Sequence, residues 1–289
     1  KLIDEAKKAG ADAVKLQTYT ADTMTLNSRK KDFLISDKKS LWRGKYLYDL
    51  YKEAYTPWEW HKEISEEANK LGLVCFSSPF DESAVDFLEA TIDPPIYKIA
   101  SFEMNHFPML KKIGSTGKPV LASIGVCQDR DIERAMEVLK KSGCPEIILL
   151  HCVSEYPADP KDFCLQNMPL LREKYGTLFG LSDHSLGHLV AVASTALGAR
   201  VIEKHLCLDR ENKSVDGGFS MLPCEFAELV EAVHTTHSAI SGSEIPQKPA
   251  FFKRSILVSS PIQAGERFTP QNIRIARPGD GLCPSRWTE

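Results

Sequence analysis

The chain has 289 residues, of which 43% are hydrophobic and 26% charged, values typical of a globular protein with a substantial core. Lys plus Arg number 36 against 39 Asp plus Glu, so the net charge of −3 gives no electrostatic reason to expect nucleic acid or an acidic membrane as a partner. The eight cysteines lack a zinc-type spacing, and no signal-peptide pattern or apolar membrane span is visible, so we expect reduced thiols and a cytoplasmic protein.

Short apolar runs alternate with amphipathic stretches from Gly10 to about Leu208, which is the pattern of strand–helix units around a parallel sheet. The expected strands are Ala13–Gln17, Val74–Ser77, Tyr97–Ala100, Val120–Ser123, Ile147–Cys152, Phe179–Ser182 and Val201–His205. The expected helices are Trp58–Leu71, Glu82–Thr91, Pro108–Gly114, Asp129–Lys141, Leu186–Leu197 and Pro223–Ser241. The first residues read as the end of a helix that stops at Gly10, so we expect further residues before Lys1.

Seven strands with a helix before the first predict a (β/α)₈ TIM barrel over residues 1–240 whose first strand lies upstream of residue 1; an open doubly wound sheet is the alternative. Polar residues lie at or just past the strand ends, where a barrel would gather them at one mouth. They are Lys15, Gln17, Ser78, Lys98, Ser101, Ser123, Ser154, Tyr156, Asp183, His184, Lys204 and His205.

Two segments fall outside the repeat. The connection from Thr20 to Pro57 is long and rich in aromatic residues, and these would form either a sugar-binding wall or a helix packed on the barrel. Residues 241–250 read as a linker. Residues 251–289 alternate strand-like runs with turns and predict a small β-rich domain that is incomplete at its C-terminus.

His184 and His205 end two consecutive strands, so their imidazoles could converge on one divalent metal ion. Hydrogen-bonded core histidines are the alternative. His188 shares the i, i+4 spacing with His184, but we expect it on a helix surface.

Lys15, Lys98 and Lys204 each interrupt or end an apolar strand, where an ammonium group is costly without an anion. A phosphate or carboxylate ligand would supply that anion. Ion pairs of Lys98 with Glu103, or of Lys204 with Glu203, are the alternative. Serines at the strand ends, including Ser182, could donate further hydrogen bonds.

Eight segments in chain order resemble the sialic acid synthase family, and the resemblance covers essentially the whole chain. They are GADAVKLQTYT, FSSPFDESAVDFLEA, PIYKIASFEMNHFPMLKKI, GKPVLASIGV, LLHCVSEYPA, GLSDHSLGH, GARVIEKHLCLDR and RPGDGL. Within the family, LWRGKYLYDLYKEAYTPWEWH and FSMLPCEF resemble the branch that makes pseudaminic acid rather than N-acetylneuraminic or legionaminic acid.

The resemblance implies a TIM barrel followed by an antifreeze-like (SAF) domain in a domain-swapped homodimer. It implies Mn²⁺ or Mg²⁺ held by His184 and His205, with phosphoenolpyruvate bound by Lys15, Lys98, Ser101, Ser123 and Ser182. Glu103, Tyr156 and Asp216 would line the sugar side, and Arg277 of the partner would reach an N-acyl group. The family's first strand carries a Glu in an AEIG-type motif that this sequence lacks, and Val215-Asp216 replaces the usual Pro-Asp.

The implied reaction condenses phosphoenolpyruvate with an N-acetylated amino-sugar aldehyde, 2,4-diacetamido-2,4,6-trideoxy-L-altrose, and releases phosphate. We expect Lys98, Glu103 and Asp216 to be catalytic. The remaining substrate-binding candidates are Gln17, Ser78, Ser154, Asp183 and Lys204. The alternatives are a synthase for N-acetylneuraminate or legionaminate, a Schiff-base aldolase that uses Lys98 or Lys204, and a non-catalytic sugar-phosphate binder.

Overall fold

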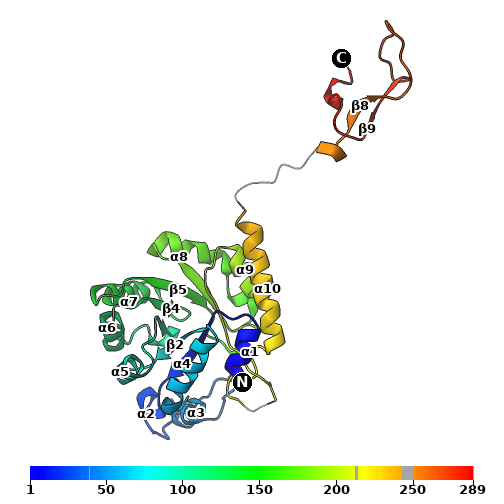
Figure 1. The fold of residues 1–289 in the computed structure, drawn as a ribbon. Helices are drawn as coiled ribbons and strands as arrows, with labels where there is room; N and C mark the ends of the chain where they lie inside the picture. Colours follow the sequence, from blue (N-terminus) through cyan, green and yellow to red (C-terminus); the bar gives the residue numbers. More distant parts are fainter. Residues whose placement is uncertain (39, 212–213, 243–249, 289) are drawn as a thin grey trace. The chain divides into compact units, whose positions relative to one another are not determined.

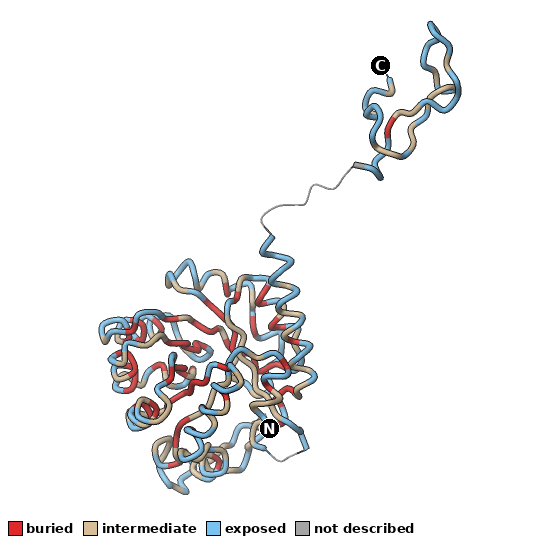
Figure 2. Tube along the Cα trace, viewed as in Figure 1, coloured by how far each residue is buried: buried red, intermediate tan, exposed pale blue. Residues whose placement is uncertain are grey.

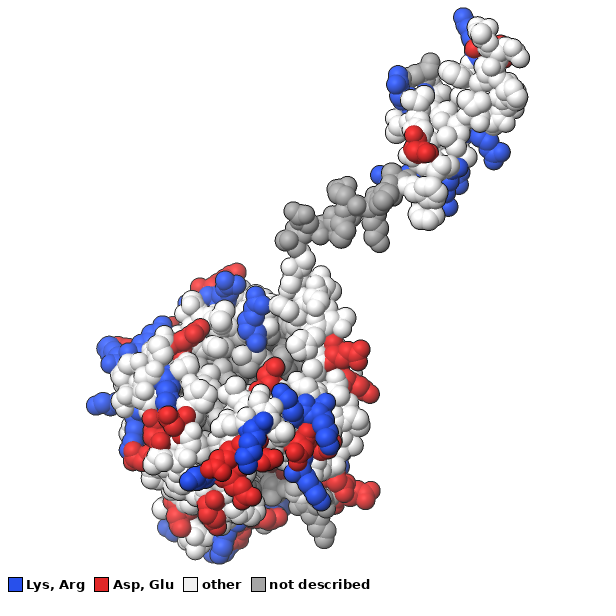
Figure 3. Space-filling view, viewed as in Figure 1, with Lys and Arg blue, Asp and Glu red and all other residues white. Residues whose placement is uncertain are grey.

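The computed structural model describes residues 1–38, 40–211, 214–242 and 250–288. The chain divides into two compact units, Lys1–Ile240 and Ser241–Glu289. No helix among the described residues is both long and apolar enough to cross a membrane. On the face of the first unit that Figure 3 shows, acidic and basic side chains are interspersed rather than gathered into one basic patch.

The first unit is built on a sheet of seven parallel strands that lie side by side in chain order. The strands are β1 (Ala13–Thr18), β2 (Val74–Pro79), β3 (Tyr97–Ile99), β4 (Val120–Ser123), β5 (Ile147–Cys152), β6 (Phe179–Asp183) and β7 (Ile202–Lys204). A doubly wound sheet would reverse direction after its first strands and place β1 in the interior. The observed order therefore excludes that alternative.

The sheet curls so far that its first and last strands approach each other. Lys15 on β1 lies 2.8 Å from Glu203 on β7, although each strand is at an edge of the sheet. Helices cover the outer face (Figure 1). They are α1 (Leu2–Lys8), α4 (His61–Lys70), α5 (Glu82–Thr91), α6 (Phe107–Ser115), α7 (Asp129–Lys141), α8 (Met168–Tyr175), α9 (Leu189–Ala196) and α10 (Pro223–Ile240). The first unit is therefore an α/β fold with a curled parallel sheet.

Alternation along the strands separates an inner from an outer set of side chains. Phe76, Leu121 and Leu150 pack together on the inner face, below the polar residues of the strand ends. On the outer face the strands contribute to a large cluster with α5, α6 and α7, in which Ile113 and Leu139 are fully buried. Figure 2 shows this burial along the strands and the sheet-facing sides of the helices.

The helices begin and end where local chemistry favours it. Asp81 caps α5 by accepting hydrogen bonds from the backbone N–H groups of Ser83 and Ala84. The predicted helix over 186–197 begins only at Leu189, because Asp183 binds the backbone N–H and hydroxyl of Ser185 and holds that turn outside the helix.

The connection of residues 20–57 contains more regular structure than the sequence indicated. It forms α2 (Ala21–Met24), the 3₁₀ turn η1 (Lys31–Phe33) and α3 (Leu47–Ala54), whereas 3₁₀ turn η2 (Trp58–Trp60) leads into α4. Leu34 and Tyr46 form an antiparallel bridge inside it.

The second unit contains an antiparallel pair, β8 (Ser255–Val258) and β9 (Ile273–Ala276). Its centre is Ser255, which is 1% exposed and accepts a hydrogen bond from the N–H of Gly281. Most of the predicted linker, residues 243–249, lies outside the described residues.

Candidate active site at the carboxyl ends of the strands

Two lysines share one carboxylate at the centre of the strand ends. Glu203 lies 2.8 Å from the ammonium group of Lys15 and 3.4 Å from that of Lys98. The hydroxyl of Ser182 donates a third bond to Glu203, 2.9 Å long. Since β1, β3, β6 and β7 each contribute one of these residues, only the curled sheet can assemble them.

The charges of this cluster depend on one another. Burial by itself raises the pKa of Glu203, but the ammonium groups of Lys15 and Lys98 outweigh it and hold that pKa well below its usual range. Burial lowers the pKa of Lys98, and Glu203 opposes the change. Lys15, Lys98 and Glu203 by themselves carry a net positive charge, which suits an anion.

His184 and His205 follow β6 and β7 and bring their rings to a centroid separation of 5.6 Å. Nδ1 of His184 donates a 2.8 Å hydrogen bond to the carbonyl of Val153. In the neutral ring Nε2 is then unprotonated, and its lone pair can bind a metal ion. Burial lowers the pKa of His184, and burial with the nearby Lys15 and His184 lowers that of His205 to about 3. Both imidazoles are therefore neutral near pH 7, the form that binds metals.

This pair fits a partial metal site. The hydrogen bond from Nδ1 of His184 to the carbonyl of Val153 fixes the ring orientation, as such bonds do for metal-binding histidines. Nδ1 of His205 lies 3.5 Å from the carboxylate of Asp216, whose pKa is raised by burial. No group of three or more candidate ligands occurs among the described residues, so a bound ion would need further ligands from substrate or water.

Glu103 supplies a carboxyl group of a different kind. Burial raises its pKa to about 7, and the nearby ammonium of Lys98 only partly opposes this. Its Oε2 atom is buried without a hydrogen-bond partner. A carboxyl with a pKa near 7 can accept and return protons under ordinary conditions.

Serines at the strand ends form a neutral lining. Ser78, Ser101, Ser123 and Ser182 are each less than a tenth exposed. The Ser123 hydroxyl is buried with no protein partner, whereas Ser101 Oγ accepts from the N–H of Val126. Gln17 is aligned with Ser78 in the β1–β2 ladder, and Ser154 follows β5.

Asp183 and Lys204 are not brought to this mouth. They alternate with the inward Ser182, His184, Glu203 and His205, and so occupy the outer face of the same strands. Lys204 lies 2.9 Å from Asp183, with the two side chains 1% and 0% exposed. Lys204 also donates to the carbonyl of Ser185. Lys204 therefore pairs with Asp183, not with Glu203, and the pair joins β6 to β7 structurally.

Aromatic rings stand beside the histidines. Tyr156 lies against His184, with ring centroids 4.3 Å apart, and Phe219 lies 4.9 Å from His205. Trp42, from the long connection, approaches Tyr156 at 5.8 Å. Arg277 belongs to the second unit, where its Nε donates to the carbonyl of Phe252.

Sequence reasoning missed the importance of Glu203 and Phe219 and left Trp42 among several loop aromatics. Glu203 could have been found by strand alternation, because it stands two residues before His205 and must share its face. Alternation does not mark Phe219 or Trp42, since both reach the mouth from loops. The available signal is that they lie in the segments FSMLPCEF and LWRGKYLYDLYKEAYTPWEWH, which resemble one branch of the family.

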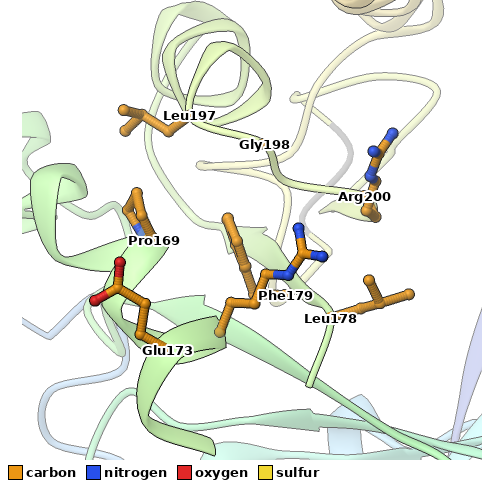
Figure 4. Close-up of a pocket in the computed structure, with 8 residues that line it drawn as sticks. Pro169, Glu173, Leu178, Phe179, Leu197, Gly198 and Arg200 are labelled. Atoms are coloured by element: carbon orange, nitrogen blue, oxygen red, sulfur yellow. The ribbon is translucent and has the colours of Figure 1, made fainter. Parts of the chain in front are cut away.

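A separate pocket of about 230 Å³ lies at the other end of the strands. Figure 4 shows Phe179, the first residue of β6, with Pro169 and Glu173 of α8 to its left and Leu197 and Gly198 above it. It is remote from the lysines and histidines and takes no part in the site described above.

A profile of the NeuB family matches residues 2–245. The chain belongs to the NeuB family. It is 43% identical to a pseudaminic acid synthase of Campylobacter jejuni, in an alignment that covers all of this chain and 85% of that protein. It is 42% identical to a pseudaminic acid synthase of Helicobacter pylori, in an alignment that covers 98% of this chain and 84% of that protein. The crystal structure of an N-acetylneuraminic acid synthetase from Leptospira borgpetersenii superposes with a TM-score of 0.74 at 30% identity, covering 86% of this chain and 80% of that one. The α/β fold with its curled parallel sheet of seven strands is consistent with a TIM-barrel-like fold.

Proposed function

We propose that this protein is a pseudaminic acid synthase, which condenses phosphoenolpyruvate with 2,4-diacetamido-2,4,6-trideoxy-L-altrose and releases phosphate. The observation that carries the proposal is the joint placement of Lys15 and Lys98 around one buried carboxylate, beside two neutral imidazoles. The identity to relatives of that name over the whole chain supports the choice of sugar.

Phosphoenolpyruvate would bind at the lysines. Its phosphate and carboxylate would meet Lys15 and Lys98, with the unpartnered Ser123 hydroxyl and Ser182 as neutral donors. Positive groups fixed in advance also stabilise the phosphate as it leaves. Glu203 would keep the two lysines in place and limit their mutual repulsion.

The reaction forms a bond between C3 of phosphoenolpyruvate and the aldehyde carbon, and water adds at C2 as phosphate departs. Glu103 would take the proton of that water, because its pKa of about 7 leaves much of it ionised at neutral pH. Tyr156 and Asp216 would lie on the sugar side.

His184 and His205 would hold a divalent ion, Mn²⁺ or Mg²⁺. When bound, such an ion polarises an aldehyde oxygen as a Lewis acid. The chain's own contribution is to keep both imidazoles neutral and to orient His184 through Val153.

An eighth strand between β7 and β1 would complete a (β/α)₈ barrel, since these two strands do not pair with each other among the described residues although their side chains meet. The second unit would be an antifreeze-like domain, and in a domain-swapped homodimer its Arg277 would enter the partner's mouth.

A phosphate-release assay tests the function. Phosphoenolpyruvate would be offered with the trideoxy sugar, with N-acetylmannosamine and with a legionaminic acid precursor, each with and without a chelator. We expect the trideoxy sugar to give the highest kcat/KM and the chelator to abolish turnover. A higher kcat/KM with either other sugar would reassign the branch.

A Schiff-base aldolase has one observation in its favour, the lowered pKa of the buried Lys98. Borohydride treatment during turnover separates the two chemistries. Covalent trapping of substrate on Lys98, with activity that survives the chelator, would favour the aldolase; the synthase predicts neither.

A further inference from the structure

Four rings make a continuous wall beside the charged cluster. Tyr156 contacts His184 and Phe219, Phe219 contacts His205, and the two histidines contact each other, with centroid separations of 4.3 to 5.6 Å. Tyr156 and Phe219 therefore cover the side of the histidines with carbon-rich surface.

Trp42 extends this wall from a different part of the chain. Its ring lies 5.8 Å from that of Tyr156, and its Nε1–H donates a 3.1 Å hydrogen bond to the carbonyl of Val215, next to Asp216. Leu41 supports the same junction, because a Cβ on Gly218 would lie 3.6 Å from Leu41 Cδ1. Two neighbouring residues thus attach the long connection to the loop that carries Asp216 and Phe219.

The site is consequently divided by chemistry. Lys15, Lys98 and Glu203 offer charge to the phosphorylated substrate, whereas Trp42, Tyr156 and Phe219 offer ring faces. Ring faces favour C–H groups and methyls. A hydroxyl pressed against them loses water without gaining a partner.

We infer that Trp42 is a specificity-determining residue, which selects a deoxygenated, doubly acetamidated sugar over a fully hydroxylated one. The inference rests on the proposed function. Its indole, fixed by Val215, would pack on the C6 methyl and an acetamido methyl of the trideoxy sugar. N-acetylmannosamine carries a hydroxyl at C6 and loses that contact. A methyl in such a pocket is worth roughly 10- to 200-fold in discrimination.

Steady-state kinetics of Trp42→Ala, Trp42→Phe and Trp60→Ala test this in the intact protein. Trp60 is the matched control, since it lies close by in sequence, is 55% exposed and belongs to η2 rather than to the wall. We expect Trp42→Ala to raise KM for the trideoxy sugar about tenfold or more and to lower its preference over N-acetylmannosamine, with KM for phosphoenolpyruvate unchanged. Trp42→Phe should lie between this variant and wild type, and Trp60→Ala should match wild type.

The outcomes are distinguishable. Wild-type protein that releases no phosphate with any of these sugars removes the proposed function and the inference with it. If the wild-type protein is active, either of two results overturns the inference alone. In the first, Trp42→Ala keeps the KM for the trideoxy sugar and the preference between sugars. In the second, it raises the KM values for both sugars and for phosphoenolpyruvate equally, as the loss of a purely structural residue would. Calorimetric titration with phosphoenolpyruvate, without sugar, checks that the charged half of the mouth is intact in each variant.

Discussion

At the scale of single residues, two ammonium groups share one carboxylate at the strand ends. Lys15 and Lys98 both lie within 3.4 Å of Glu203, whose side chain is 13% exposed. Removing one member of a buried ionic cluster leaves the others uncompensated, which costs more than the pair itself contributes. The cluster is therefore a point where stability and ligand binding are coupled.

Glu203→Gln should lower the free energy of unfolding by about 3 to 5 kcal/mol, because both lysines lose their counter-charge. Inorganic phosphate should recover part of that loss by binding between them. Urea unfolding with and without phosphate measures both effects. Glu137→Gln is the control: its carboxylate pairs with Lys141 on the surface of α7, where solvent screens the pair, and its loss should change the free energy of unfolding very little. A Glu203 variant as stable as this control would contradict the charge argument.

Glu103 should make stability depend on pH. Its pKa is about 7 in the folded protein against 4.5 as the ordinary value, so the folded state binds more protons between these values. The free energy of unfolding therefore falls as the pH rises from about 4.5 to about 7. Glu103→Gln removes the cost of ionising this group, and at about pH 8 it should gain up to about 3 kcal/mol over wild type.

At about pH 4 the gain of Glu103→Gln should disappear, because the wild-type group is then protonated in both states. A constant difference between variant and wild type across this range would refute the raised pKa. In kcat/KM the wild type should show a limb that rises through about pH 7 and that Glu103→Gln lacks.

His205→Ala tests the metal proposal with a binding measurement. The variant should stay folded, because the described imidazole of His205 makes no polar contact closer than its 3.5 Å approach to Asp216, and the 2.9 Å bond from the N–H of Met221 to the backbone carbonyl of residue 205 does not involve the side chain. It should bind Mn²⁺ at least tenfold more weakly by calorimetry or electron paramagnetic resonance, and lose metal-dependent phosphate release. Unaltered Mn²⁺ affinity would remove His205 from the site.

At the scale of elements, β6 and β7 approach so closely that one position admits only glycine. A Cβ on Gly180 would lie 2.5 Å from the carbonyl oxygen of Val201 and 2.7 Å from Cδ2 of Leu150. These atoms belong to backbone and packed core, which cannot move aside cheaply. The close approach at Gly180 and Val201 therefore also sets the distance between Ser182 and Glu203, which lie two residues further along the same strands.

Gly180→Ala should destabilise the protein by about 1 to 3 kcal/mol through overpacking, and it should also weaken phosphoenolpyruvate binding by displacing β7. Thermal unfolding and the KM for phosphoenolpyruvate report the two effects. Gly242→Ala, at a position where a new Cβ meets nothing within 4 Å, should change neither.

The strands and most helices could be predicted because their periodicity is local. Val120–Ser123, Ile147–Cys152, Glu82–Thr91 and Asp129–Lys141 coincide with β4, β5, α5 and α7. The helices of the 20–57 connection could not, since their apolar residues pack on partners distant in sequence. Tyr51 of α3, for example, makes an edge-to-face contact with Tyr19, which makes another with Phe80.

The site was predictable in outline for the same reason. Strand ends in a parallel sheet meet at one edge, which suffices to bring Lys15, Lys98, His184 and His205 together. The sequence could not show that Asp183 and Lys204 pair with each other, because that depends on the register of β6 with β7, in which the two residues lie opposite each other. Nor could it show which carboxylate the lysines would share.

At the scale of the whole molecule, the proposed exchange of domains makes a prediction about mixtures. Arg277→Ala and Lys98→Met should each be inactive. Arg277→Ala damages the site of the partner subunit, whereas Lys98→Met damages the site of the chain that carries it. Unfolding and refolding them together should restore activity, up to about a quarter of wild-type sites for random pairing of equal amounts. Mixtures that stay inactive while forming dimers would show that each site is built from a single chain.

The pairing of Lys15 with Glu203 also bears on how the protein is made. Lys15 and Lys98 emerge from the ribosome long before Glu203, and until it arrives their charges repel inside a half-formed sheet with no neutralising group. A nascent chain that stops before β7 should therefore stay open and hydrated at this end. It would offer quality-control proteases an accessible substrate rather than a partly active enzyme.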